Sequence, residues 1–246
     1  MNLASTIATS RLVGQQRAMD ITAANLANTA TPGYRAQRVQ FADWLSRQKA
    51  GRTPPGGQLV AFTQDRATWR EQRSGALTRT GNPLDLAIAG DGFFTVQTPR
   101  GPRLTRAGKF SLTGDGGIAD DSGHKLLNSE NQPLRVPAGD TRISVSGDGA
   151  ISTESGPLGR VGVVRPADPM RLQAEGERLF RVDGPTQPVA QPGMVQGTLE
   201  ASNVQPILET TRMMAALREF QFVTQFVQAE SDRQKDAIDR LLRPRS

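Results

Sequence analysis

The sequence predicts an α+β protein in which long N- and C-terminal helices pair in a coiled-coil-like layer and flank a mainly antiparallel central β domain. Glycine and proline are sparse at both ends of the 246-residue chain and dense in its middle, where they separate short β-like runs. Apolar residues at both ends recur with helical spacing. We expect four segments: helix and junction (1–41), linker or extended segment (42–75), β domain (76–196) and C-terminal helix (197–246).

Composition narrows the class of protein. Hydrophobic residues make up 36% and aromatic residues 5%, with 25 glycines and 16 prolines, which favours a lean β region over the thick core of an α/β enzyme. The net charge is +6, but basic and acidic residues are interspersed and form no basic run, so no nucleic-acid partner is expected. The absence of cysteine excludes disulfides and cysteine-ligated metals.

Neither a cleaved signal peptide nor a membrane span is expected. The first 28 residues lack a basic region followed by an apolar one. No stretch of the chain approaches 18 consecutive apolar residues.

The N-terminal segment is predicted to be one amphipathic helix from Leu3 to Ala27. It contains no proline and a single glycine, and Leu12, Met19 and Leu26 recur every seven residues. This spacing places the three side chains along one side of the helix.

A defined turn is predicted where this helix ends. Asn28 tolerates the left-handed conformation that often ends helices. Pro32 forces the residue before it away from helical geometry, and Pro32-Gly33 has the sequence of a type II turn. Tyr34, the single tyrosine, is expected to anchor the turn, and Val39 and Phe41 alternate as in a strand.

The middle of the chain is predicted to be all β. Residues 49–58, KAGRTPPGGQ, read as a linker because adjacent prolines and glycines disfavour helices and strand interiors. From Ala76 to Met194, short runs such as GFFTVQT and GRVGVVRP are separated by turn sequences.

The C-terminal segment is predicted to be a long helix that needs partners. No glycine or proline occurs from Ile207 to Arg243, a span of roughly 55 Å as a helix, whereas a β domain of about 120 residues is roughly 35 Å across. The helix therefore needs its own N-terminal helix and neighbouring subunits to cover its apolar side. That side has a heptad register of Met213, Leu217, Phe220, Val227, Ile238 and Leu241.

Three motifs, in order along the chain, resemble those of the flagellar axial proteins, the bacterial rod and hook family. They are ANLANTATPGYR (residues 24–35), the stretch beginning GNPLDLAIAGDGFFTV and continuing through LTRAG (81–116), and GTLEASNV (197–204). Ala24 stands where the family has a second asparagine, and Leu104 replaces an aromatic residue.

The resemblance implies a structural subunit of the flagellar basal-body rod. It also implies assembly with proximal and distal rod proteins, export through the flagellum's own secretion path without a cleaved signal, and a place in the periplasm-spanning rod. A sister rod protein of the same family is an alternative. The residues expected at the assembly interface are Leu12, Met19, Asn25, Leu26, Asn28, Met213, Leu217, Phe220, Val227, Ile238 and Leu241, and those expected to form the turn and its anchor are Pro32, Gly33 and Tyr34.

No catalytic, cofactor-binding or metal-binding residue is expected, and no small-molecule substrate. His124, the single histidine, lies in a turn sequence without a nucleophile signature around it. The Gly-Asp-Gly units lack the ligand spacing of a calcium loop. A secreted rod-associated β-domain enzyme is the alternative from another class, but it would need paired catalytic carboxylates or a metal cluster.

Overall fold

The chain folds as α+β, with a helix at each end and a mainly antiparallel β region between them. The computed structural model describes residues 3–48, 58–168, 171–176 and 178–242, and the side chains within 8–39, 69–168, 171–176, 178–239. The helices are α1 (Leu3–Ala27) and α2 (Pro206–Leu242). The strands are β1 (Gln37–Gln48), β2 (Gln58–Arg70), β3 (Leu77–Arg79), β4 (Leu86–Ile88), β5 (Phe93–Thr98), β6 (Gly101–Thr105), β7 (Phe110–Leu112), β8 (Ile118–Asp120), β9 (Lys125–Leu126), β10 (Ser144–Val145), β11 (Ala150–Thr153), β12 (Gly156–Arg160), β13 (Val163–Pro166), β14 (Leu172–Glu175), β15 (Leu179–Val182), β16 (Thr186–Pro188), β17 (Met194–Gln196) and β18 (Thr198–Glu200).

Contacts divide the chain into two compact units that do not follow sequence order. The helical unit comprises Met1–Ala27, Gln37–Glu71 and Gln205–Ser246, and the β unit comprises Asn28–Ala36 and Gln72–Val204. The domain boundaries drawn from the sequence stay a prediction, since each unit joins segments that are distant along the chain.

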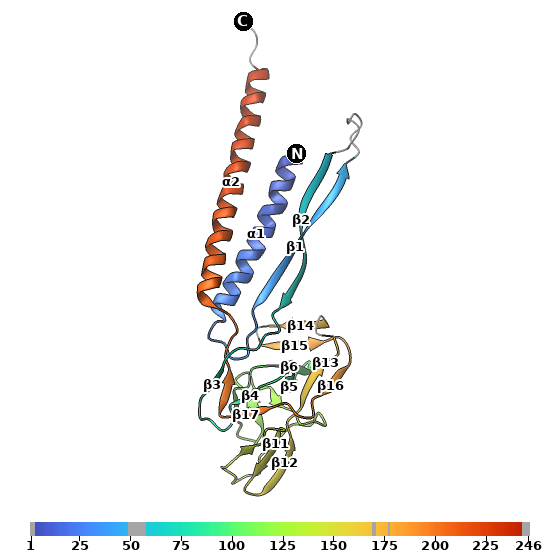
Figure 1. Ribbon diagram of the computed structural model, residues 1–246, viewed down its shortest axis with the longest axis vertical. Coiled ribbons are helices and arrows are strands. Elements are labelled where there is room, and N and C mark those ends of the chain that lie inside the picture. The colour runs from blue at the N-terminus through green and yellow to red at the C-terminus, as the bar shows by residue number, and fades with distance from the viewer. Residues whose placement is uncertain (1–2, 49–57, 169–170, 177, 243–246) are drawn as a thin grey trace. The chain divides into compact units, whose positions relative to one another are not determined.

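In the helical unit, α1 packs against α2 and against a long β-hairpin (Figure 1). The strands β1 and β2 pair antiparallel from Gln37 opposite Arg70 to Gln48 opposite Gln58, with a bulge between Gln40 and Phe41. The strand-like exit predicted after Tyr34 is therefore the start of β1. Of the linker expected at residues 49–58, only Gln58 belongs to the described part of the chain, as the first residue of β2.

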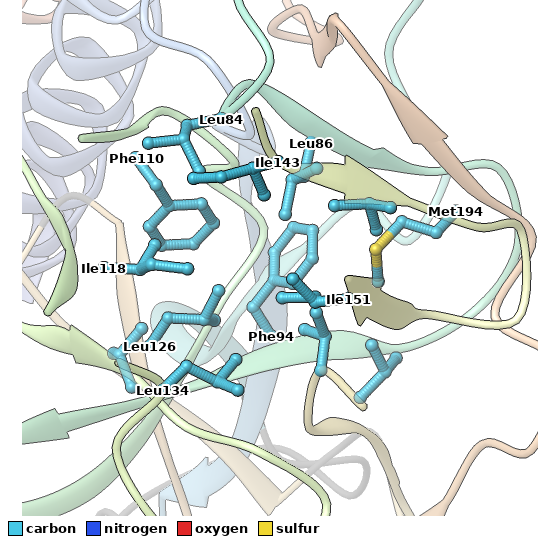
Figure 2. Packing of buried hydrophobic residues seen from close by; sticks show 14 of the residues in the cluster. Leu84, Leu86, Phe94, Phe110, Ile118, Leu126, Leu134, Ile143, Ile151 and Met194 are labelled. Carbon is cyan, nitrogen blue, oxygen red and sulfur yellow. The ribbon is translucent and has the colours of Figure 1, made fainter. Parts of the chain in front are cut away.

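In the β unit, β5 is the central strand. It pairs antiparallel with β6, β9 and β13, and β15 and β14 extend the sheet beyond β6. Alternate residues of a strand point to opposite faces, so Phe94 and Val96 enter the main apolar core (Figure 2). Phe93 faces the other way and packs with Leu104 and Phe180 in a smaller cluster.

The last two strands of the β unit return to its first two. β17 pairs with β4 and β18 pairs with β3, both antiparallel. The segment around Glu200 is thus brought beside the segment from Leu77 to Ile88, although more than a hundred residues separate them in sequence.

A close backbone crossing inside the β unit requires glycine at position 108. The amide of Leu86 donates to the carbonyl of Gly108 at 2.9 Å. A Cβ atom at position 108 would lie 1.6 Å from the carbonyl oxygen of Leu86. Both close neighbours are backbone atoms, so the strand itself would have to move.

We expect Gly108→Ala to destabilise the β unit by about 1–3 kcal/mol or more, as other overpacked sites do. Gly114→Ala is the matched control, because a Cβ there meets nothing within 4 Å. Urea unfolding of the full chain measures both variants. Equal stabilities for the two would contradict this account of the crossing.

Candidate assembly interface

The side of α2 that is covered within the chain is not quite the predicted one. Val223 is buried, at 7% exposure, and Phe220 is half-buried, whereas Leu217 is 47% exposed and Ile238 is 55% exposed. The side chain of Leu241 lies outside the described residues. The covered positions are spaced alternately by four and three residues, as predicted, but every second one lies one residue earlier than in the predicted register. They are Glu209, Met213, Ala216, Phe220, Val223, Val227 and Glu230.

On α1, the covered side is likewise rotated from the predicted one. Leu12, Met19 and Leu26 are only half-buried. Ile21 and Asn25 are buried instead, Asn25 completely.

Asn25 joins α1 to both other parts of the helical unit. Its side-chain amide donates to the carbonyl of Gln37 at 3.0 Å and to Oε2 of Glu209 at 3.0 Å, while its Oδ1 accepts from the amide of Gln37 at 2.8 Å. Arg38 donates to Oε1 of Glu209 at 2.8 Å and to Glu71 at 2.7 Å. One asparagine therefore fixes where the end of α1 meets β1 and the first turn of α2.

Glu209 is a buried carboxylate that stays ionised. Burial opposes its ionisation, but hydrogen bonds from Asn25 and Arg38 outweigh burial and hold the pKa of Glu209 below its usual value. Arg212, three residues along α2, also donates to it at 2.6 Å. The negative charge lies in the first turn of α2, where the helix dipole also favours an anion.

Another side of α2 carries apolar side chains that nothing in the described structure covers. Leu208, Ala215, Phe222 and Ala229 are spaced by seven residues, and all four are exposed. Phe222 is 71% exposed, and Phe226 beside it is 49% exposed. We call these five residues the outward face of α2.

The turn after α1 has the geometry that its sequence predicts. Gly33 has a φ of 70°, and the amide of Tyr34 donates to the carbonyl of Thr31 at 3.2 Å, closing the turn over Pro32-Gly33. Asn28 is buried, and its side chain accepts a hydrogen bond from the Thr31 hydroxyl at 3.0 Å. Asn28 is not among the residues with positive φ, so it does not adopt the left-handed conformation expected of it.

Gly33 lies against the backbone of the second motif. A Cβ at this position would be 2.4 Å from the carbonyl carbon of Arg106, and the amide of Gly33 donates to the carbonyl of Glu200 at 2.8 Å. Tyr34 is 3% exposed and packs with Ala36 and Val204. The turn is thus built into the β unit from both sides.

Sequence reasoning did not identify the ion pair at the centre of this arrangement. Arg106 is completely buried, and its Nε donates to Oε2 of Glu200 at 2.7 Å. The rest of its guanidinium group donates to the carbonyls of Ile88, Gly90 and Gly92 at 3.1, 3.0 and 2.6 Å. One signal in the sequence could have indicated the pair. The motifs LTRAG and TLEAS consist otherwise of apolar and small residues, and each contains a single charged residue.

The three quoted motifs therefore meet in space. Arg35 from the first motif lies 3.8 Å from Oε1 of Glu200 in the third. Asn203, also in the third, accepts from the amide of Ala36 at 2.8 Å and donates to the carbonyl of Arg73 at 2.7 Å. From Asn28 onward, the residues of the three motifs thus form one packed and hydrogen-bonded cluster within the β unit.

The single histidine, considered above as a possible catalytic residue, is hydrogen-bonded within its own turn. The imidazole Nδ1 of His124 lies 3.0 Å from Oδ2 of Asp120, whose Oδ1 accepts from the amides of Ser122 and His124 in the same turn. Among the described residues, no group of three or more acidic, histidine or cysteine side chains has the arrangement of a metal site. No helix in the described part of the chain is long and apolar enough to cross a membrane.

We expect Arg106→Met to destabilise the β unit by about 3–5 kcal/mol, because it strands a buried carboxylate and removes the donor from three carbonyls. Lys109→Met is the control, since Lys109 pairs with Asp121 at the surface at 3.3 Å and exposed pairs contribute less than about 1 kcal/mol. Chemical unfolding compares the two. A loss at Arg106 no larger than at Lys109 would show that the buried pair is dispensable.

The lowered pKa of Glu209 predicts an acid-dependent contribution to the stability of the helical unit. Its ionised form stabilises the fold fully above the ordinary glutamate pKa of 4.5, and this contribution fades as the pH falls through the lower folded-state pKa. The destabilisation caused by Glu209→Gln should therefore be largest near neutral pH and shrink in acid. Urea titrations of the helical circular dichroism signal measure it, with the exposed Glu130→Gln as control; a pH-independent difference at Glu209 would contradict the prediction.

Sequence comparisons agree with the three-motif cluster. Models of three protein families match in order: "Flagella basal body rod protein" at residues 6–35, "Flagellar hook protein FlgE/F/G D1 domain" at 87–153 and "Flagellar basal body rod FlgEFG protein C-terminal" at 195–240. Each match contains part of the cluster, namely Gly33, Arg106 and Glu200.

Full-length relatives carry the same description. The chain is 32% identical to a flagellar basal-body rod protein FlgF of Caulobacter vibrioides over 98% of both chains, and 32% identical to FlgF of Rhizobium meliloti over 96% of both. It is also 32% identical to FlgG of Bacillus subtilis, over 84% of this chain and 86% of that one. Chain length, the short linker and the terminal sequence QAESDRQKDAIDRLL favour FlgF over its sister FlgG. With three family models matched in order along the chain and relatives of this identity and length, the chain belongs to the family of flagellar basal-body rod proteins, structural subunits of the basal body, and is most like FlgF.

Proposed function

We propose that this rod subunit joins its neighbours through the outward face of α2, with α1 and α2 forming a coiled-coil-like layer together with helices of adjacent axial subunits. The observation that carries the proposal is the row Leu208, Ala215, Phe222 and Ala229, exposed along a helix whose other side is already covered. A helix with apolar residues on both sides is typical of one that packs against more than one partner.

The energetics favour a partner for this face. Covering a Phe or Leu side chain contributes about 1.5–3 kcal/mol, and Phe222 alone is 71% exposed. Because the row repeats every seven residues, it suits another helix laid alongside. Contacts between non-identical surfaces of successive subunits build open helical assemblies, as a rod requires.

The finer biological setting is part of the same proposal. The subunit would contact proximal and distal rod proteins, transmit torque along the rod and span part of the periplasm, having left the cell through the flagellar export apparatus without cleavage of a signal peptide. The family membership supports this setting. We propose no catalytic role and no cofactor, because His124 is held by Asp120 within one turn.

The interface residues predicted from sequence divide between two roles in this proposal. Met213, Phe220 and Val227 lie on the covered side of α2, so they hold the subunit's own helices together. Leu217 is exposed and is available to neighbours. Asn25 acts within the chain, through its bonds to Gln37 and Glu209.

We expect Phe222→Asp to prevent incorporation into the rod and abolish swimming while leaving the fold of the isolated chain unchanged. A charge at this position would be stranded in an apolar contact only after assembly. The control is Gln221→Asp, an exposed polar neighbour on the same helix. Motility in soft agar, the subunit content of purified basal bodies and thermal unfolding of the purified chain are the measurements.

A second variant, on the covered side of α2, distinguishes a loss of assembly from a loss of stability. Phe220→Asp should lower the stability of the purified chain as well as motility, because Phe220 is half-buried within the chain. Normal swimming of the Phe222→Asp strain would overturn the assignment of the outward face.

A further inference from the structure

A pocket of about 770 Å³ lies among five strands of the β unit, β5, β6, β13, β15 and β16, which all contribute to its wall. β5 pairs with β6 along one edge and with β13 along the other. β6 pairs in turn with β15, and β13 pairs with β16. Because residues 183–185 join β15 to β16, the five strands surround the pocket.

The deep part of the pocket is apolar. Leu104 and Phe180 are 5% and 4% exposed, and both line the pocket and pack with Phe93 in the smaller apolar cluster. Val164 and Val182 pack against this cluster and line the pocket as well. The pocket is therefore open space that continues an apolar cluster.

Thr95 adds one polar group to this apolar wall. It follows Phe93 by two residues on β5, so both side chains point to the same face of the sheet, and it lines the pocket. Thr95 is 4% exposed, and its hydroxyl has no hydrogen-bond partner among the residues that the structure describes. Enclosing a hydroxyl without a partner is unfavourable. Thr105, on the neighbouring strand, differs: its hydroxyl accepts from the amide of Ala107 at 3.0 Å.

The charged groups of the pocket are already balanced. Three arginines line it, and each donates to an acidic residue: Arg103 to Glu175 at 2.8 Å, Arg160 to Asp148 at 2.9 Å and Arg181 to Asp183 at 3.1 Å. An occupant therefore needs no charge of its own. It needs apolar surface and one group that can form a hydrogen bond.

The pocket suits a side chain better than an added strand. Pro102 and Pro188 line it, on β6 and β16. Proline has no amide hydrogen, so these two strands lack donors that a further strand would need for a continuous ladder. Recognition here depends on filling the pocket.

We propose that the pocket receives an uncharged aromatic side chain, a tyrosine or tryptophan, from a neighbouring axial subunit. The inference rests on the proposed assembly of the chain into the rod. Such a side chain has an apolar body that fits beside Leu104 and Phe180, and one polar edge that can pair with the Thr95 hydroxyl. Rotation about the Cα–Cβ bond of Thr95, from one staggered rotamer to another, turns the enclosed hydroxyl toward the entering group. Aromatic side chains in desolvated pockets are typical anchors of protein interfaces.

The unpaired hydroxyl predicts opposite effects of Thr95→Val on stability and on assembly. The substitution keeps the side-chain shape and removes a group without a partner, so the urea midpoint of the purified full chain should stay unchanged or rise. Incorporation into the rod should fall severalfold. Thr105→Val is the matched control and should lower the midpoint, because it leaves the amide of Ala107 without its acceptor. Equal losses of stability in the two variants, or normal incorporation of Thr95→Val, would overturn the proposed role of Thr95.

Small aromatic molecules test the pocket on the purified chain. p-Cresol, which has the phenol group of a tyrosine side chain, should bind saturably and shift the nuclear magnetic resonance methyl signals of Val164 and Val182. Thr95→Val should weaken p-cresol binding about fivefold and leave the binding of toluene unchanged. An equal loss for both molecules would contradict the hydrogen bond to Thr95. Unchanged methyl signals with both, as expected of a pocket that holds only water, would overturn the assignment.

Site-specific photo-crosslinking in flagellated cells identifies the occupant. A residue with a diazirine group at Ala190, which is exposed and lines the pocket, is expected to crosslink to an axial subunit at a peptide containing Tyr or Trp. The same residue at Phe222 reports on the outward face of α2, and at the exposed Arg142 it gives the background. Mass spectrometry of purified basal bodies identifies the crosslinked peptides.

The three positions distinguish failure of this inference from failure of the proposed function. Crosslinks to axial subunits at Phe222, with none above background at Ala190, would overturn the pocket assignment and leave the helical interface standing. Absence of axial crosslinks at both positions would overturn both. A crosslink from Ala190 to a protein outside the rod, or to a peptide without Tyr or Trp, would also contradict the proposal.

Discussion

The β unit depends on one buried ion pair, between Arg106 and Glu200. Arg106 has no exposed side-chain surface. Besides pairing with Glu200, it donates hydrogen bonds to the carbonyls of Ile88, Gly90 and Gly92. Apolar packing is not directional, so the sixteen-residue core alone would tolerate shifts of the surrounding loops. A guanidinium group has fixed donor directions, so it does not tolerate such shifts. It fixes the strand ends, the returning segment at Glu200 and the turn at Gly33 in one arrangement.

A second buried polar cluster has the same role in the helical unit. Glu209 in the first turn of α2 accepts hydrogen bonds from Asn25 and Arg38, and Asn25 also pairs with the backbone of Gln37. Because a buried carboxylate without partners is strongly unfavourable, this cluster sets the rotation of both helices. The rotation places Val223 inside and leaves Leu217 and Phe222 outside.

The two clusters explain how a structural subunit can keep apolar surface for its neighbours. Each unit is specified by directional polar contacts, so the remaining apolar residues of α2 are not required for the subunit's own fold. They are available for assembly, as the proposed helical interface requires.

The sequence by itself determined both helices, the β character of the middle, the type II turn and the family. Local geometry governs the first three: proline and glycine set backbone angles, and helical or strand periodicity follows from side-chain spacing. Tertiary structure decided the rest. A heptad pattern gives the spacing of apolar residues but not which of two neighbouring rows along the helix is buried. Here the hydrogen bond between Asn25 and Glu209 determines which row is buried. Arg106 and Glu200 are 94 residues apart, and no local rule pairs them, because the attraction between them acts only after the strands have brought them together.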